Sequence, residues 1–136
     1  MRHTYDCRVR WSDVDAYGHV NNVKYFEYYQ EARIAFLQEL GGDWTNSAGS
    51  ERFVVARLTV DYRRPIMFRA DPFPIDSWVT RIGNSSYDVR SQIRDGDEVL
   101  SRAVAVLVGY NMTTSRSRPL SNAERAALNG MLEPAW

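Results

Sequence analysis

Two titratable side chains, Asp15 and His19, lie four residues apart in a polar stretch directly before a long helical pattern. Gly18, Asn21 and Asn22 complete this stretch. The first turn of a helix leaves its N–H groups without acceptors inside the helix and carries a partial positive charge. A carboxylate, an imidazole and free N–H groups gathered in one loop suit chemistry on a carbonyl group.

The simplest interpretation of the two acids Asp13 and Asp15 is local, because carboxylates near a helix start usually cap the helix or brace a turn. We assign that structural role to Asp13. We expect Asn21 or Asn22 to cap the helix, with a side-chain oxygen accepting an N–H of the first turn. A loop histidine such as His19 is as often structural as catalytic, so both interpretations stay open here.

A long helix is predicted for residues 23–40, since apolar side chains recur there at intervals of three and four. The side chains expected on its buried face are Val23, Phe26, Tyr29, the stem of Arg33, Phe36, Leu37 and Leu40. Further aromatic and small side chains widen the apolar stripe, which indicates a helix partly wrapped by a curved sheet. These are Tyr25, Tyr28, Ala32 and Ala35. Gly41 and Gly42 are expected to end the helix.

The rest of the chain is dominated by strand patterns rich in Val, Ile, Tyr and Phe. Strands are predicted for residues 5–11, 53–64, 73–84, 86–94 and 99–110. The last is almost wholly apolar after Arg102, so we expect a central strand covered on both faces. The D-G-D sequence at residues 95–97 indicates a hairpin turn. Ser121 and Glu124 form a capping-box pattern before a short helix that ends near Asn129.

This order of elements predicts an α+β fold in which one long helix lies against an antiparallel sheet. We expect the 136 residues to form a single domain. The edges and the second face of such a sheet favour pairing with another copy of the chain.

The composition is that of an ordinary globular protein and argues against several functions. The 17 basic and 17 acidic side chains balance, which disfavours a nucleic-acid partner. Cys7 is the only cysteine, so no intrachain disulfide can form, and with only His3 and His19 no structural metal site is expected. Neither a signal peptide, a membrane span nor a nucleotide-binding motif is recognisable. We therefore expect a cytoplasmic protein with no membrane partner and no bound cofactor.

Residues 13–33, D-V-D-A-Y-G-H-V-N-N-V-K-Y-F-E-Y-Y-Q-E-A-R, resemble the opening motif of the hotdog-fold thioesterases of the 4-hydroxybenzoyl-CoA and bacterial acyl-CoA type. The resemblance extends along the chain through I-G-N-S-S-Y at residues 82–87, D-G-D-E-V-L at 95–100 and S-R-P-L-S-N-A-E-R at 117–125. It implies a hotdog fold, in which a curved antiparallel sheet wraps the long helix. It also implies homodimers or homotetramers with active sites between subunits.

The resemblance assigns roles to the polar loop. In the bacterial branch the second acid of the D-x-D pair is the catalytic carboxylate, which places that role on Asp15, as nucleophile or general base. Backbone N–H groups at the helix start, here near Asn22, polarise the thioester carbonyl. Related plant acyl-carrier-protein thioesterases carry an asparagine between the acid and the histidine, where this sequence has Tyr17. His19 is therefore assigned an assisting role, in which it positions water or holds the loop.

The predicted reaction is hydrolysis of a fatty or aryl acyl-CoA to the free acid and CoA. We assign Tyr17, Gly18 and Tyr25 to the substrate-binding surface. Arg116 and Arg118 are candidates for the phosphates of coenzyme A, because arginine pairs well with phosphate. A solvated tail explains these two arginines equally well.

Two other functions stay open. The chain could be a catalytically silent dimer that binds acyl-CoA. It could also be a hotdog hydratase or dehydratase, although that branch carries D-x-N-P-x-H, in which the acid and the histidine are further apart than Asp15 and His19.

Overall fold

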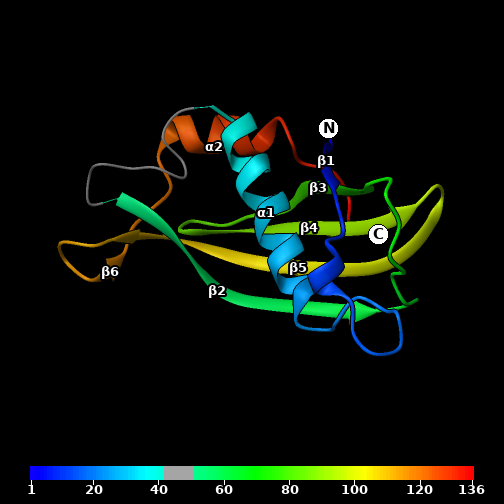
Figure 1. Cartoon of the computed structure of the whole chain (residues 1–136). Helices are drawn as coiled ribbons and strands as arrows, with labels where there is room; N and C mark the ends of the chain where they lie inside the picture. Colours follow the sequence, from blue (N-terminus) through cyan, green and yellow to red (C-terminus); the bar gives the residue numbers. More distant parts are fainter. Residues whose placement is uncertain (42–50) are drawn as a thin grey trace.

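The computed structural model describes residues 1–41 and 51–136, in which one antiparallel sheet is crossed by a long helix (Figure 1). The elements in chain order are β1 (His3–Cys7), the 3₁₀ turn η1 (Trp11–Asp13), α1 (Lys24–Glu39), β2 (Glu51–Tyr62), β3 (Phe73–Ile82), β4 (Ser86–Asp95), β5 (Glu98–Asn111), β6 (Arg116–Ser117) and α2 (Asn122–Asn129). The strands lie in the order β1-β3-β4-β5-β2, and β6 pairs with the end of β5. The expected α+β arrangement is confirmed.

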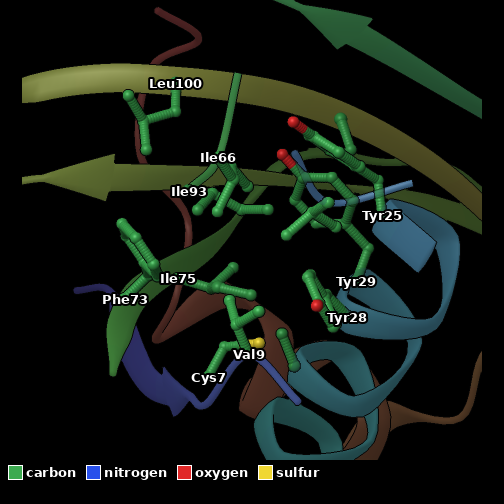
Figure 2. Close-up of a cluster of buried hydrophobic side chains, with 13 residues drawn as sticks. Cys7, Val9, Tyr25, Tyr28, Tyr29, Ile66, Phe73, Ile75, Ile93 and Leu100 are labelled. Atoms are coloured by element: carbon green, nitrogen blue, oxygen red, sulfur yellow. The ribbon is translucent and has the colours of Figure 1, made fainter. Parts of the chain in front are cut away.

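Buried side chains fill the space between α1 and one face of the sheet. One cluster joins the three tyrosines of α1 to strand residues such as Ile75 and Ile93, as Figure 2 shows. A second cluster joins Phe36 and Leu37 to the other half of the sheet and to Leu128 of α2. Because alternate residues of a strand face the same side, each strand contributes every second side chain to this core.

The buried face of α1 is rotated relative to the predicted one. The buried residues are Tyr25, Tyr28, Tyr29, Ala32, Phe36 and Leu37. Val23 and Phe26, expected on that face, are exposed, Phe26 by 41%. The reason is that a tyrosine can be buried when its hydroxyl finds a partner. The Tyr28 hydroxyl donates to Asp13 and the Tyr29 hydroxyl donates to Ser101, so these rings replace the more apolar side chains in the core.

Helix α1 begins without the predicted asparagine cap. Val23 occupies the N-cap position and makes no capping bond with its side chain. The side-chain oxygen of Asn21 accepts the N–H of Val23 at 3.1 Å, so this asparagine stabilises the turn before the helix. Gly41, with φ of +85°, follows the end of α1 as predicted, whereas Gly42 lies outside the described residues. In residues 1–41 and 51–136, no helix combines the length and apolar character that a membrane crossing needs.

Two predicted strands differ from the observed ones. β1 ends at Cys7 because the chain then leaves β3 and enters η1, and Trp11 is 75% exposed instead of facing the core. β5 is central, between β4 and β2, but only one of its faces is buried. Val104 and Val106 on the other face are half-buried, since α1 covers one side of the sheet only.

The predicted turn and the short C-terminal helix are confirmed. Gly96 adopts a φ of +59° in the turn between β4 and β5. The Ser121 hydroxyl accepts the N–H of Glu124 at 3.1 Å, and the Glu124 carboxylate accepts the N–H of Ser121 at 2.7 Å. This reciprocal pair is the capping box that starts α2.

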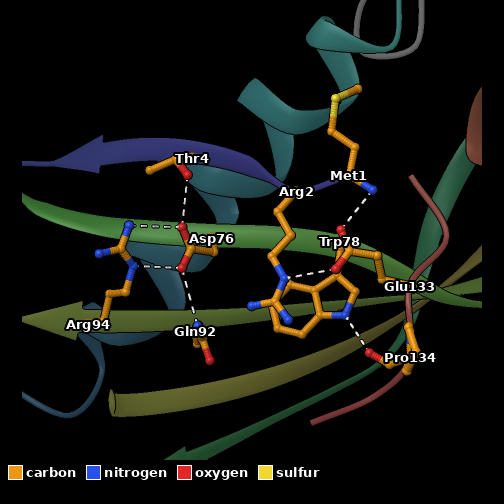
Figure 3. A network of polar contacts seen from close by, with 9 residues as sticks. All are labelled: Met1, Arg2, Thr4, Asp76, Trp78, Gln92, Arg94, Glu133 and Pro134. Carbon is orange, nitrogen blue, oxygen red and sulfur yellow. Dashed lines mark hydrogen bonds and ion pairs between the residues drawn. The ribbon is translucent and has the colours of Figure 1, made fainter. Parts of the chain in front are cut away.

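The face of the sheet opposite α1 holds both chain termini against β3 (Figure 3). Alternation along β3 turns Asp76 and Trp78 to this side. The buried carboxylate of Asp76 accepts hydrogen bonds from Thr4, Gln92 and Arg94. The Trp78 indole N–H donates to the carbonyl oxygen of Pro134 at 3.1 Å, and the N-terminal amino group pairs with Glu133 at 2.7 Å.

Phe36→Ala is expected to lower the free energy of unfolding by about 3–5 kcal/mol, since the ring is fully buried between α1 and the sheet. Phe26→Ala makes the same change on the exposed side of the same helix. Its expected effect is less than about 1 kcal/mol. Urea unfolding followed by circular dichroism measures both, and equal losses would contradict the buried face assigned to α1.

Candidate active site

Asp15 stands at the start of a tight loop that its own hydrogen bonds define. Its N–H donates to the carbonyl oxygen of His19 at 2.8 Å, and its carbonyl oxygen accepts the N–H of Gly18 at 3.1 Å. Oxygen Oδ1 accepts the N–H groups of Tyr17 at 2.9 Å and His19 at 3.2 Å. Gly18 has a φ of +80°, which glycine adopts without strain. Oxygen Oδ2 has no hydrogen-bond partner within the described chain and is free for a substrate or water.

Asp13, two residues earlier, anchors the loop to α1. Its side chain is 1% exposed and accepts hydrogen bonds from the Tyr28 hydroxyl at 2.6 Å and from the Arg10 N–H at 3.0 Å. Burial opposes the charge, but the hydrogen bonds from Tyr28 and Arg10 outweigh burial and hold the pKa of Asp13 below its ordinary value. Burial and the neighbouring Asp13 together raise the pKa of Tyr28. The structural role predicted for Asp13 is confirmed.

The start of α1 presents an unpaired N–H at Asn22. The carbonyl oxygen of Asn22 accepts the Tyr25 N–H at 3.4 Å and the Tyr62 hydroxyl at 3.0 Å. The Tyr62 ring lies edge-on to the Tyr25 ring, with centroids 4.7 Å apart. Tyr62, at the end of β2, therefore fixes the first residues of the helix. The N–H of Asn22 finds no acceptor in residues 1–41 and 51–136.

These groups surround one hollow of about 230 Å³. Its lining residues are Asp15, His19, Val20, Asn22, Tyr25, Tyr62, Arg63, Arg64 and Pro65. The structure thus brings together four of the predicted site residues, Asp15, His19, Asn22 and Tyr25. The imidazole of His19 makes no hydrogen bond to the described residues. The Asp15 carboxylate bonds to the main-chain N–H of His19 and not to the His19 ring.

Four predicted site residues do not line this hollow. The Tyr17 side chain is 84% exposed, and Gly18 serves the turn. Tyr62 pairs with Ser101 of β5, whereas Arg116 pairs with Asn111, ten residues further along that strand. At about 3.3 Å per residue, this spacing puts Arg116 about 33 Å along the sheet from Tyr62.

Arg118 is also engaged elsewhere in the chain. Its guanidinium donates to both carboxylate oxygens of Glu124, at 2.9 and 3.0 Å. Neither Arg116 nor Arg118 lines the hollow that contains Asp15 of the same chain. Their role in phosphate binding stays a prediction that depends on a second subunit.

The sequence interpretation omitted the segment from Tyr62 to Pro65. Its Y-R-R-P sequence directly follows a strand, where loop residues often carry function. Both Arg63 and Arg64 donate their N–H groups to the carbonyl oxygen of Leu100 at 3.0 Å. The backbone at this strand end is therefore fixed beside the loop that carries Asp15.

A helix that starts beside an acidic loop and packs on one antiparallel sheet is the architecture of the hotdog thioester hydrolases. The sequence model of the thioesterase-like superfamily matches residues 9–128. The chain belongs to this superfamily. The predicted hotdog fold and the predicted class, a thioester hydrolase, are thereby confirmed.

Individual relatives agree with the assignment of the chain to this superfamily. The chain is 28% identical over 129 residues to the long-chain acyl-CoA thioesterase FadM of Escherichia coli, covering 93% of this chain and 96% of FadM. It is 32% identical to the PA2801 protein of Pseudomonas aeruginosa, with a TM-score of 0.82 and coverage of 92% and 96% of the two chains. It is 31% identical to a Thermus thermophilus thioesterase complexed with coenzyme A and Zn, with a TM-score of 0.80 and coverage of 94% and 92%.

Tyr28→Phe is expected to lower the free energy of unfolding by about 1–3 kcal/mol, because the buried carboxylate of Asp13 then lacks one donor. The pKa of Asp13 in the folded protein should rise in this variant. Urea unfolding at neutral pH measures the loss. Tyr110→Phe is the matched control, since the Tyr110 side chain is half-buried and its hydroxyl makes no hydrogen bond to the described residues.

The same pair predicts a pH dependence. The folded-state pKa of Asp13 lies below the unfolded value, so its stabilisation is complete above the unfolded pKa. This stabilisation is lost as the pH falls through the folded pKa. The stability difference between the wild type and Tyr28→Phe should therefore shrink in acid, and a difference that grows as the pH falls would contradict the assignment.

Proposed function

We propose that the protein hydrolyses the thioester of a fatty or aryl acyl-CoA to the free acid and CoA. The observation that carries this proposal is the single hollow lined by both the carboxylate of Asp15 and the helix start at Asn22. Hydrolysis of a thioester needs both groups, one to deliver oxygen and one to stabilise the oxyanion. The similarity to FadM and to the thioesterase complexed with coenzyme A supports CoA as the carrier.

In the proposed reaction, the thioester carbonyl oxygen accepts the free N–H of Asn22. Negative charge then develops on that oxygen at the positive end of α1, where the fixed dipole stabilises it. Oxygen Oδ2 of Asp15 either takes a proton from an attacking water or attacks the carbonyl carbon to give a mixed anhydride that water hydrolyses. In both cases the C–S bond breaks and CoA leaves as a thiolate. The thiolate takes its proton from protonated Asp15 on the first route and from the water that hydrolyses the anhydride on the second. The unpaired ring of His19 helps to position the water.

The same proposal includes a homodimer with its active sites between subunits. β2 is a strand of 12 residues that pairs with β5 on one side, and no strand in residues 1–41 and 51–136 pairs with its other edge. An open edge of this length favours antiparallel pairing with β2 of a second copy about a two-fold axis. Such pairing sets the start of one β2 beside the end of the other. Arg116 and Arg118 of one subunit would then approach the Asp15 side of its partner.

Asp15→Asn is expected to lower kcat by a factor of about 100 to 10,000, because the amide can neither accept the proton nor attack the carbonyl. Thiol release from short, long and aryl acyl-CoA substrates measures this and ranks the acyl groups. Asp71→Asn, an exposed carboxylate outside the hollow, should keep full activity. A folded Asp15→Asn variant with wild-type activity would remove Asp15 from the mechanism. A wild type that binds acyl-CoA without releasing thiol would be a silent binding protein.

Sedimentation of the purified chain at assay concentrations should give a mass of at least twice 15.7 kDa. Thr59→Pro in β2 is expected to weaken the dimer, since proline removes an N–H and disfavours strand pairing. The melting temperature and the far-ultraviolet circular dichroism of this variant report whether the pairing of β2 with β5 survives. A wild-type chain that sediments as a monomer and is fully active would exclude sites shared between subunits.

A further inference from the structure

A second hollow, of about 620 Å³, adjoins the candidate active site. Arg63, Arg64 and Pro65 line both hollows, so the two adjoin each other at the end of β2. Beyond these three residues, the second hollow is lined by Glu98, Val99 and Arg102. A ligand held at Asp15 therefore lies beside residues that also line the second hollow.

The second hollow is strongly basic for a chain with no net charge. It contains three guanidinium groups and one carboxylate, a balance of 3 − 1 = +2. Arg63 and Arg102 form no ion pair with any carboxylate in residues 1–41 and 51–136. Arg64 pairs with Glu98 at 3.3 Å, and both side chains are more than half exposed. Exposed ion pairs are weak, so an anionic ligand can replace this one.

The segments that carry the three arginines are attached to the rest of the chain. The N–H groups of Arg63 and Arg64 share the carbonyl oxygen of Leu100 as acceptor, which ties this strand end to β5. The guanidinium of Arg102 stacks over the ring of Trp136, 4.9 Å from its centroid. Guanidinium groups match the geometry of phosphate oxygens and can bind them with two parallel hydrogen bonds.

Resting on the proposed thioesterase function, we infer that this second hollow binds the phosphates of the coenzyme A nucleotide and makes the enzyme selective for CoA thioesters. CoA carries an uncharged arm between its thioester and a nucleotide with several phosphate charges. In the protein, Asp15 lines the first hollow and the three arginines line the second hollow, which adjoins it. A concave site of this volume is typical of a small-molecule ligand. A carrier protein would need a broad contact surface instead.

Binding can be measured without turnover by titrating the full-length protein with coenzyme A and with pantetheine in a calorimeter. The wild type should bind coenzyme A more tightly than pantetheine, and its advantage should fall as ionic strength rises. The double variant Arg63→Gln/Arg64→Gln should bind coenzyme A about tenfold or more weakly and pantetheine as before. Arg8→Gln, which removes one charge from a separate hollow between β1 and α1, is the control and should change neither.

Kinetics separate this inference from the proposed function. In the double variant, KM for acyl-CoA should rise about tenfold, whereas kcat/KM for an acyl-N-acetylcysteamine thioester, which has no phosphate, should fall far less. If the wild type cleaves both thioesters and the double variant binds and cleaves acyl-CoA normally, the inference is overturned and the function stands. If the wild type cleaves neither thioester, the function fails, and the calorimetry alone decides about the hollow.

Two further outcomes complete the test. Loss of activity on an acyl-carrier-protein substrate, with coenzyme A binding intact, would assign the arginines to a carrier protein and overturn the inference. Melting temperatures within a few degrees of the wild type exclude misfolding as the cause of weaker binding. If the double variant melts much earlier, Arg63→Lys serves as a second variant. Arg63→Lys keeps the charge, so it should bind coenzyme A more tightly than Arg63→Gln does. It should still bind coenzyme A less tightly than the wild type, because lysine cannot bind phosphate with the two parallel hydrogen bonds of arginine.

Discussion

The packing of α1 against one face of a single antiparallel sheet is the constraint on which the rest of the structure depends. Burial of Tyr29, Phe36 and Leu37 removes a large apolar area from water, which is the dominant favourable contribution to folding. Since this packing fixes both the axis and the rotation of the helix, it also fixes where the helix begins. The start of α1 is therefore a defined point beside the end of β2 and not a frayed terminus.

Buried polar groups set the register of this packing. Tyr28 reaches Asp13, Tyr29 reaches Ser101, and Ser77 bonds to Ser91 within the sheet. A helix rotated by one residue would leave the Tyr28 and Tyr29 hydroxyls without these partners, at a cost greater than a single bond contributes. The Asp13 contact has a second consequence. It attaches the loop to the helix, and thereby places Asp15 beside Asn22 in the turn that precedes α1.

Both hollows near this point depend on the end of β2. Tyr62 holds the carbonyl of Asn22, and the next two residues bond to Leu100 at the start of β5. The loop that carries Asp15 is bonded to the segment that carries Arg63 and Arg64, since the N–H of Val20 donates to the carbonyl oxygen of Ile66 at 2.8 Å. The groups proposed for catalysis and for phosphate binding therefore keep their spacing, which oriented catalysis requires.

The sequence by itself determined the helix, four of the strands to within two or three residues, the turn at Gly96 and the capping box at Ser121. These features follow from periodicity and local hydrogen bonding, which neighbouring residues encode. The same local pattern, with the family resemblance, identified Asp15, His19, Asn22 and Tyr25, and these four do line one hollow.

Tertiary structure alone decided the rest, because each remaining feature depends on partners far apart in the sequence. Phe26 is exposed and Tyr28 is buried because Asp13 offers its carboxylate to a hydroxyl, which hydrophobicity patterns do not record. Arg116 and Arg118 resembled phosphate ligands by type, yet strand register puts them at the other end of the sheet. The arginines beside Asp15 are Arg63 and Arg64, about 50 residues away in sequence, and contacts of the Asp15 loop with Ile66 and Met67 bring them there.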